Sequence, residues 1–181
     1  KIIGDINRVL RKHTTNRRIA AKQWVNDIEA VYEFRPLTKH NVAALRALNM
    51  KLFPFRNGKP YYKDLLKGRM GMDSLMLFEK DSDVLVGATV WWDVADETAY
   101  IATFGIRDSF RERGLGSYLM KHCLSRIRST DNFERALLVV IPPNEPAIKL
   151  YLKCGFVQRG TNVSLDGEHE YERILTHCND G

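Results

Sequence analysis

The hydrophobic positions of the chain fall into helix-like and strand-like runs that alternate along the sequence. Helical spacing of apolar residues predicts helices over residues 2–12, 38–50, 61–67, 114–128 and 144–154. Strand-like runs cover residues 30–37, 74–79, 84–93, 99–106 and 136–141, with a closing strand or pair of strands within 156–175. The order of these elements predicts an α/β fold, a mixed sheet with helices on both faces.

Local signals refine several of these elements. Thr38 is predicted to cap the helix 38–50, and Asn144 the last helix. The segment 136–141 is a continuous apolar run, which predicts a strand buried on both faces. Trp91 and Trp92 must face opposite sides of their strand, so one is expected in the core and the other along a cleft.

The start of the chain differs from the rest in its charge. Seven of the 28 Lys and Arg residues fall within residues 1–22, opposed there only by Asp5. Residues 1–28 are therefore predicted to form a basic amphipathic extension, a helix over 2–12 and then a polar connector, ahead of a compact domain of residues 29–181. Such a segment fits a protein partner, a ribosome or other RNA, a lipid surface, or simply a solvated helix face.

Composition narrows the class of protein. With 181 residues, of which 44% are hydrophobic and 28% charged, the chain fits one globular domain with a short extension. The sequence has no apolar run of the roughly 18 residues that span a bilayer and no signal-peptide pattern, so a cytoplasmic and also nuclear location is expected. The three cysteines show no metal-ligand spacing, and neither a metal site nor a disulfide framework is expected.

The most informative segment joins the predicted strand 99–106 to the helix 114–128. It contains Arg111, Arg113, Gly114, Gly116 and Ser117. The glycines let backbone N–H groups approach a ligand closely, and the helix N-terminus adds partial positive charge. This combination predicts a pyrophosphate site, although a G-x-G pair also occurs in ordinary connecting turns.

Two sequence motifs resemble those of a known family. Arg111-x-x-Gly114-x-Gly116 resembles the acetyl-CoA signature of the GCN5-related N-acetyltransferase (GNAT) superfamily. A second motif of that superfamily resembles Asn144-Glu-Pro-Ala-Ile148 followed by Leu150-Tyr151-x-x-x-Gly155-Phe156. The resemblance covers residues 34–156. It implies acetyl-CoA as cofactor and a mostly antiparallel sheet with one splayed parallel strand pair.

A narrower resemblance points to N-terminal α-acetyltransferases of the NatE and NatF type. It is carried by Leu48-Asn49 through Leu52-Phe53-Pro54, by Tyr62-Lys63-Asp64-Leu65-Leu66 and by Tyr100-Ile101-Ala102-Thr103-Phe104-Gly105. The implied function is acetyl transfer by direct attack of the α-amino group of a protein N-terminus, typically Met-first. Two alternatives remain open: a GNAT enzyme for a small amine or lysine side chain, or a non-catalytic acetyl-CoA-binding subunit.

The resemblance also implies roles for individual residues. Tyr151 is the implied general acid for the departing thiolate, and Tyr100 the residue that helps deprotonate the amine. Contacts to acetyl-CoA are implied for Phe104, Ile106, Arg111, Arg113, Gly114, Leu115, Gly116, Ser117 and Asn144. Contacts to the acceptor substrate are implied for Phe53, Pro54, Phe55, Tyr61, Tyr100 and Val139.

Two features depart from the family pattern. Val139 stands where the family has a histidine base, and none of the five histidines, including the predicted surface residue His122, replaces it. An α-amino group has a pKa of about 7.8, so about a quarter to a third of such groups are already neutral at a pH of about 7.4. For a lysine side chain the neutral fraction is only about 0.1%. Water relayed through Tyr100, or a backbone carbonyl, is therefore expected to suffice. The sequence also shows no clear match to the family's closing aromatic hairpin, since Asp166-Gly167 marks a turn with Tyr171 as the nearest aromatic residue.

Overall fold

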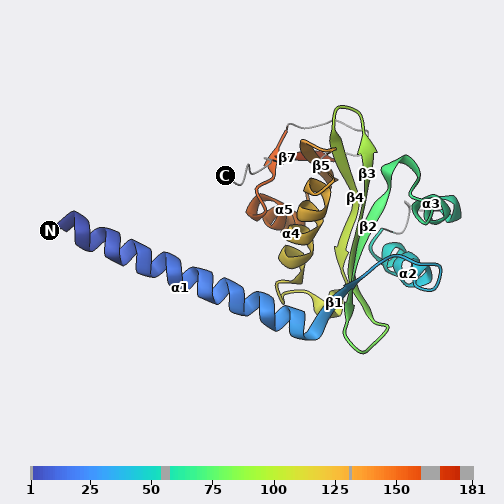
Figure 1. The fold of residues 1–181 in the computed structure, drawn as a ribbon. Coiled ribbons are helices and arrows are strands. Elements are labelled where there is room, and N and C mark those ends of the chain that lie inside the picture. Colours follow the sequence, from blue (N-terminus) through green and yellow to red (C-terminus); the bar gives the residue numbers. More distant parts are fainter. Residues whose placement is uncertain (1, 54–57, 131, 160–167, 176–181) are drawn as a thin grey trace.

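A computed structural model describes residues 2–53, 58–130, 132–159 and 168–175, and within these ranges the side chains of Thr14 and of residues from 17 onward. Its centre is a seven-stranded sheet in the order β1-β2-β3-β4-β5-β7-β6 (Figure 1). The strands are β1 Tyr32–Arg35, β2 Asp73–Glu79, β3 Leu85–Val94, β4 Thr98–Ile106, β5 Arg135–Val140, β6 Val157–Gln158 and β7 His169–Ile174. Neighbouring strands are antiparallel except β4 and β5, which are parallel, so the predicted mixed sheet is confirmed.

Helices cover both faces of this sheet, as the element order predicts. One face carries α4 and α5, and the other carries α2 and α3 (Figure 1). The helices are α1 Ile2–Val31, α2 Val42–Leu52, α3 Lys59–Leu65, α4 Leu115–Arg128 and α5 Glu145–Lys153, with short 3-10 turns η1 Arg69–Gly71 and η2 Asp108–Phe110. The core lies in two layers between the helices and the sheet, one on each face of the sheet.

Several boundaries differ from the sequence prediction for identifiable reasons. Helix α2 begins at Val42 and not directly after Thr38. The Asn41 side chain accepts a hydrogen bond from Thr38 N at 2.8 Å and donates one to the Pro36 carbonyl at 2.9 Å, and Thr38 Oγ1 accepts one from His40 N at 3.3 Å. These bonds hold residues 36–41 in a turn. Strand β5 alternates between buried and half-buried residues along its length, so the prediction of burial on both faces is wrong.

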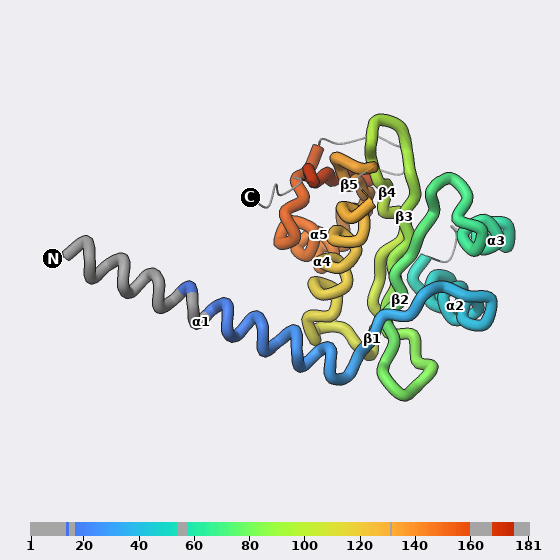
Figure 2. The backbone as a smooth tube through the Cα atoms, viewed as in Figure 1, coloured from blue at the N-terminus to red at the C-terminus, as the bar shows by residue number. Residues whose placement is uncertain are grey.

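Helix α1 also departs from the prediction. One continuous helix, Ile2–Val31, takes the place of a short helix and a connector. Near its end Trp24, Val25 and Ile28 pack into the core against α4 and β1, while residues 17–23 lead away from the sheet (Figure 2). The division of the chain at residue 28 stays a prediction, and α1 crosses that position without a break.

Two kinds of feature are absent from the described residues. Across the described ranges, no helix has both the length and the apolar character that crossing a bilayer requires. Within the same ranges, no group of three or more His, Cys, Asp or Glu residues is placed to hold a metal ion.

Candidate active site

A slit opens in the middle of the sheet between β4 and β5. The two strands pair at three positions only, ending at Tyr100 opposite Leu137. Beyond that point β4 continues to Ile106 alongside β3, and β5 continues to Val140 alongside β7. The facing backbone N–H and C=O groups of β4 and β5 therefore lack each other as partners, and a bound extended molecule can take their place. This slit is the splayed parallel pair that the family resemblance implies.

A β-bulge sits where the slit begins. In the register of β3 and β4, Val90 pairs with Thr103 and Trp91 with Ile101, which leaves Ala102 without a partner. The extra residue reverses which side chains of β4 face each layer. Ile101 packs on the α4 side below the bulge, whereas Phe104 packs on that side above it.

The α4 and α5 face of the slit carries Tyr151. Its ring lies 6.1 Å from the Phe104 ring and 6.0 Å from the Phe156 ring, measured between centroids, and only 6% of the residue is exposed. Burial raises the pKa of the Tyr151 hydroxyl above its ordinary value, so this group keeps its proton throughout the neutral range. Sequence and structure thus place a protonated donor beside the strand expected to hold the thioester.

The glycine turn forms the N-terminus of α4. Gly114 caps the helix with φ of 77°, a left-handed conformation that other residues rarely adopt. A Cβ on Gly116 would lie 3.2 Å from Leu150 Cδ2, so the glycine lets α4 approach α5 closely. The N–H groups of Leu115, Gly116 and Ser117 belong to the first turn, where no intrahelical acceptor exists, and they are free to bind an anion.

The two arginines of the motif fold back onto the turn itself. Arg111 donates from Nε to the Ile106 carbonyl at 3.3 Å and pairs through Nη2 with Asp108 at 2.8 Å. Arg113 donates from Nη2 to the Ser109 carbonyl at 3.0 Å and lies over the Phe110 ring. In this arrangement the arginines shape the turn, and the backbone N–H groups remain to contact a ligand. The Ile106 carbonyl accepts this Arg111 bond, so one group of a residue predicted to contact acetyl-CoA already has a protein partner.

Asn144 performs the predicted capping at the start of α5. Its Oδ1 accepts a hydrogen bond from Ala147 N at 3.4 Å. Because the cap uses the side-chain oxygen, the amide nitrogen keeps its two N–H donors for another partner. Asn144 can therefore cap the helix and contact a cofactor at the same time.

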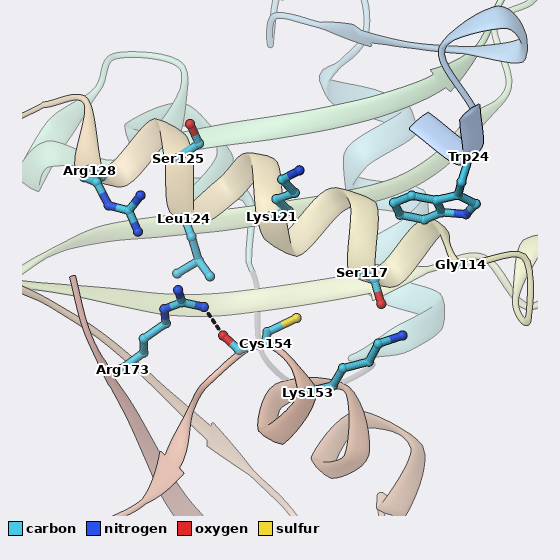
Figure 3. Close-up of a pocket in the computed structure, with 10 residues that line it drawn as sticks. All are labelled: Trp24, Gly114, Ser117, Lys121, Leu124, Ser125, Arg128, Lys153, Cys154 and Arg173. Atoms are coloured by element: carbon cyan, nitrogen blue, oxygen red, sulfur yellow. Dashed lines mark hydrogen bonds between the residues drawn. The ribbon is translucent and has the colours of Figure 1, made fainter. Parts of the chain in front are cut away.

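A cavity of about 610 Å³ extends from the glycine turn along α4 (Figure 3). Four cationic side chains line it, from α4, the end of α5 and β7: Lys121, Arg128, Lys153 and Arg173. Arg173 also donates to the Cys154 carbonyl, which fixes one wall. Among the described residues that line the cavity there is no carboxylate, so the chemistry of the cavity favours an anionic ligand.

Aromatic side chains line the opposite face of the slit, beneath α2 and α3. The Trp92 ring meets Tyr100 at 5.3 Å and Tyr61 at 6.3 Å between centroids, edge to face in both cases. Its neighbour Trp91 is 1% exposed and lies in the core, so the predicted division of the two tryptophans is confirmed for the core residue. The hydroxyls of Tyr61 and Thr103 are buried, and neither makes a hydrogen bond of good geometry.

The substrate residues predicted on the loop after α2 are only partly described. Phe53 follows the last residue of α2, and the Leu52 side chain fills the space over Gly105, which brings this helix end against β4. Pro54 and Phe55 lie outside the described residues, as do Asp166 and Gly167 of the predicted turn.

Val139 lies on the aromatic face of the slit. Its neighbours Leu138 and Val140 point into the core under α5, so Val139 alternates to the Tyr100 side. Glu170 of β7 is paired with Val139 across the strands, which puts both side chains on one face. Its side chain is 17% exposed, and its Oε1 lies 3.7 Å from Arg159 Nη1. A carboxylate therefore lies beside Val139, the position that lacks a histidine. The alternating charges of β7 were the feature of the sequence from which this carboxylate could have been predicted.

His122 is not the surface residue that the sequence predicts. Its ring lies 4.4 Å from Tyr118 and 4.9 Å from Phe34, between α4 and β1, and burial lowers its pKa. The Tyr118 hydroxyl in turn contacts Glu29 of α1 at 3.4 Å, and burial raises its pKa to about 12. This cluster anchors α1 and lies away from the slit.

Sequence comparisons agree with this geometry. The acetyltransferase (GNAT) family matches residues 42–156. N-alpha-acetyltransferase 50 of Danio rerio is 31% identical over 127 residues, which cover 68% of this chain and 73% of that protein. The probable N-acetyltransferase san of Drosophila melanogaster is 29% identical over 145 residues, covering 78% of this chain and 74% of the relative.

Solved structures share the fold. NAA60 of Arabidopsis thaliana, in complex with a bisubstrate analogue, has a TM-score of 0.70 at 19% identity, covering 79% of this chain and 97% of that one. Naa50 of the same plant, in complex with the bisubstrate analogue CoA-Ac-MVNAL, has a TM-score of 0.66 at 25% identity, covering 79% and 98%.

Proposed function

The chain belongs to the acetyltransferase (GNAT) family, and from that membership we propose that it acetylates the α-amino group of protein N-termini, with Met-first sequences preferred. The observation that carries the proposal is the slit between β4 and β5. A cofactor face with Tyr151 and an acceptor face with Tyr100 meet there from opposite sides of the sheet.

The described residues fit acetyl-CoA, the cofactor of the enzyme, which supplies an acetyl group activated as a thioester. The first-turn N–H groups of α4 would bind the pyrophosphate, and the Asn144 amide would contact the pantetheine arm. The Phe104 backbone, at the unpaired edge of β4, would hydrogen-bond the arm as a neighbouring strand does. The cationic cavity along α4 would receive the remaining phosphate.

The acceptor face suits an extended, uncharged segment better than a polyamine. Tyr61, Trp92 and Tyr100 present aromatic surface, and Val139 adds an apolar side chain. Cations of high charge bind carboxylate-rich sites, and here the carboxylate beside the slit, Glu170, is already paired with Arg159. The peptide in the analogue bound to Arabidopsis Naa50 begins with Met, which supports the Met-first part of the proposal.

Proton movements follow from the two tyrosines. Tyr151 would donate a hydrogen bond to the departing sulfur as negative charge develops there, and the thiolate would take its proton from the acetylated nitrogen through solvent. A free thiol has a pKa of about 8.5, below that of a buried tyrosine, so the gain comes from stabilising the developing charge. On the acceptor face Tyr100 would orient the amine or a water that takes its proton, and Glu170 would favour the positive charge that forms on nitrogen.

The exposed basic residues of α1, including Arg17, Arg18 and Lys22, are proposed to contact a protein partner or the ribosome. Such a contact would hold the enzyme near emerging protein N-termini. Its electrostatic character predicts weakening by salt.

Thiol release from acetyl-CoA over a panel of peptides varied at their first two residues tests the proposal. Turnover with free Met-first peptides, and none with N-blocked lysine peptides or polyamines, is the expected result. Turnover with polyamines or lysine peptides alone would show an enzyme for side-chain or small amines. Cofactor binding without any turnover would show a non-catalytic subunit.

A further inference from the structure

Helix α1 reaches the candidate cofactor site although it precedes the region that matches the family. The match begins at residue 42, whereas Trp24 of α1 lines the same cavity as Gly114 and Ser117 (Figure 3). A residue outside the shared domain thus forms part of a wall next to the glycine turn. The sequence pattern did not reveal this, because Trp24 stands in a polar, basic stretch.

The contact between Trp24 and the turn is close. A Cβ on Gly114 would lie 3.0 Å from both Cζ2 and Nε1 of Trp24, so the indole edge rests on the glycine backbone. The Trp24 ring also meets Tyr118 edge to face, with centroids 6.2 Å apart. One turn further along α1, Ile28 is 6% exposed in the core, and this packing fixes the helix in place.

The chemistry around Trp24 matches one part of acetyl-CoA. A half-buried indole offers a flat π surface and one N–H donor, and Lys121 and Lys153 contribute positive charge from the same cavity. A planar base attached to phosphates satisfies all of these groups, because bases stack on aromatic rings and phosphates bind cations. The acetyl and pantetheine parts offer neither a ring nor a charge.

We propose that Trp24 is a cofactor-binding residue that packs against the phosphorylated adenosine end of acetyl-CoA at the glycine turn. The inference rests on the proposed function only in so far as acetyl-CoA is the ligand. It makes α1 part of the cofactor site, so docking of α1 and binding of acetyl-CoA stabilise each other. A partner that displaced Trp24 and Ile28 from the core would therefore lower the affinity for acetyl-CoA. By linkage, acetyl-CoA would lower the affinity for that partner by the same factor.

The test compares acetyl-CoA with S-acetylpantetheine, which lacks the nucleotide, in the full chain. Trp24→Ala is expected to weaken acetyl-CoA binding about tenfold, the lower part of the range for loss of base–aromatic stacking. Binding of S-acetylpantetheine should stay within twofold of the wild type. Trp24→Phe, which keeps a ring, should retain most of the affinity for acetyl-CoA. The matched control is Gln23→Ala, an exposed change on the same helix, which should alter neither ligand.

Calorimetry without a peptide acceptor measures cofactor binding alone, so it tests the role of Trp24 independently of the proposed acceptor. Equal losses for both ligands in Trp24→Ala, or no loss for acetyl-CoA, would overturn the role of Trp24. Should Trp24→Ala fail to fold, the test becomes tryptophan fluorescence of the wild type and of Trp24→Phe, titrated with acetyl-CoA. Quenching by acetyl-CoA in the wild type and its loss in Trp24→Phe would support the contact, and equal quenching in both would refute it. A chain that binds acetyl-CoA but acetylates no peptide would overturn the acceptor proposal alone.

Discussion

Gly114→Ala should destabilise the protein through two separable effects. The first is the backbone, because alanine in a left-handed conformation such as φ of 77° costs about 1–2 kcal/mol. The second is steric, because the new methyl would lie 3.0 Å from two ring atoms of Trp24, and overpacking of this kind costs about 1–3 kcal/mol. A total of about 3 kcal/mol corresponds to a fall in Tm of about 6–12 °C for a chain of this length.

A double-mutant cycle with Trp24→Ala separates the two effects. Removing the indole should leave the backbone cost of Gly114→Ala unchanged and abolish the steric cost. The two changes should therefore be non-additive by about 1–3 kcal/mol in the free energy of unfolding, measured by urea denaturation of all four proteins. Strict additivity would mean that Trp24 does not rest on Gly114 in solution, and the placement of α1 at the cofactor turn would then be wrong.

Three further predictions concern the chemistry at the slit. Tyr151→Phe should lower kcat about a hundredfold while acetyl-CoA affinity stays within twofold, measured by turnover and calorimetry; an unchanged kcat would remove Tyr151 from the mechanism. For a Met-first peptide, kcat/KM should rise about tenfold per pH unit and level off near the α-amino pKa of about 7.8, because burial keeps Tyr151 protonated and Val139 cannot titrate; a plateau already reached near pH 6.5 would reveal a histidine base instead. Glu170→Gln should reduce kcat/KM several-fold by a factor that does not change with pH, because positive charge forms on nitrogen whenever the neutral amine attacks; an unchanged kcat/KM would remove Glu170 from the mechanism.

Most helices and strands could be predicted from the local spacing of apolar residues, because an element with one buried face repeats apolar residues at its own period. The strands β2 to β4 and the helices α4 and α5 lie within two residues of their predicted ends. Asn144 caps α5 as predicted because capping depends only on nearby residues. Thr38 Oγ1 does accept a hydrogen bond from His40 N at 3.3 Å, as a cap would, but the turn that it stabilises precedes the helix, which begins at Val42.

Long-range placement explains what the sequence could not show. Trp24 and Ile28 carry a helical spacing of four residues, but the surrounding charge obscured it, and their partners on α4 lie about ninety residues away. The arginines of the turn were expected to face a ligand, and their bonds to the Ile106 and Ser109 carbonyls depend on the three-dimensional path of the turn. Likewise Glu170 stands beside Val139 only through strand register.

The slit has a consequence for how the native state opens. Three residue pairs join β1–β4 to β5, β7 and β6, so backbone hydrogen bonding nearly divides the sheet into two blocks. Side-chain packing holds the blocks together, with Ile101 from one and Leu138 from the other in the same cluster. Local unfolding follows such weak boundaries, so the two blocks should exchange their amide hydrogens as separate cooperative units. Acetyl-CoA bound across the boundary would merge them into one, and cellular acetyl-CoA would then set the lifetime of the folded enzyme as well as its rate.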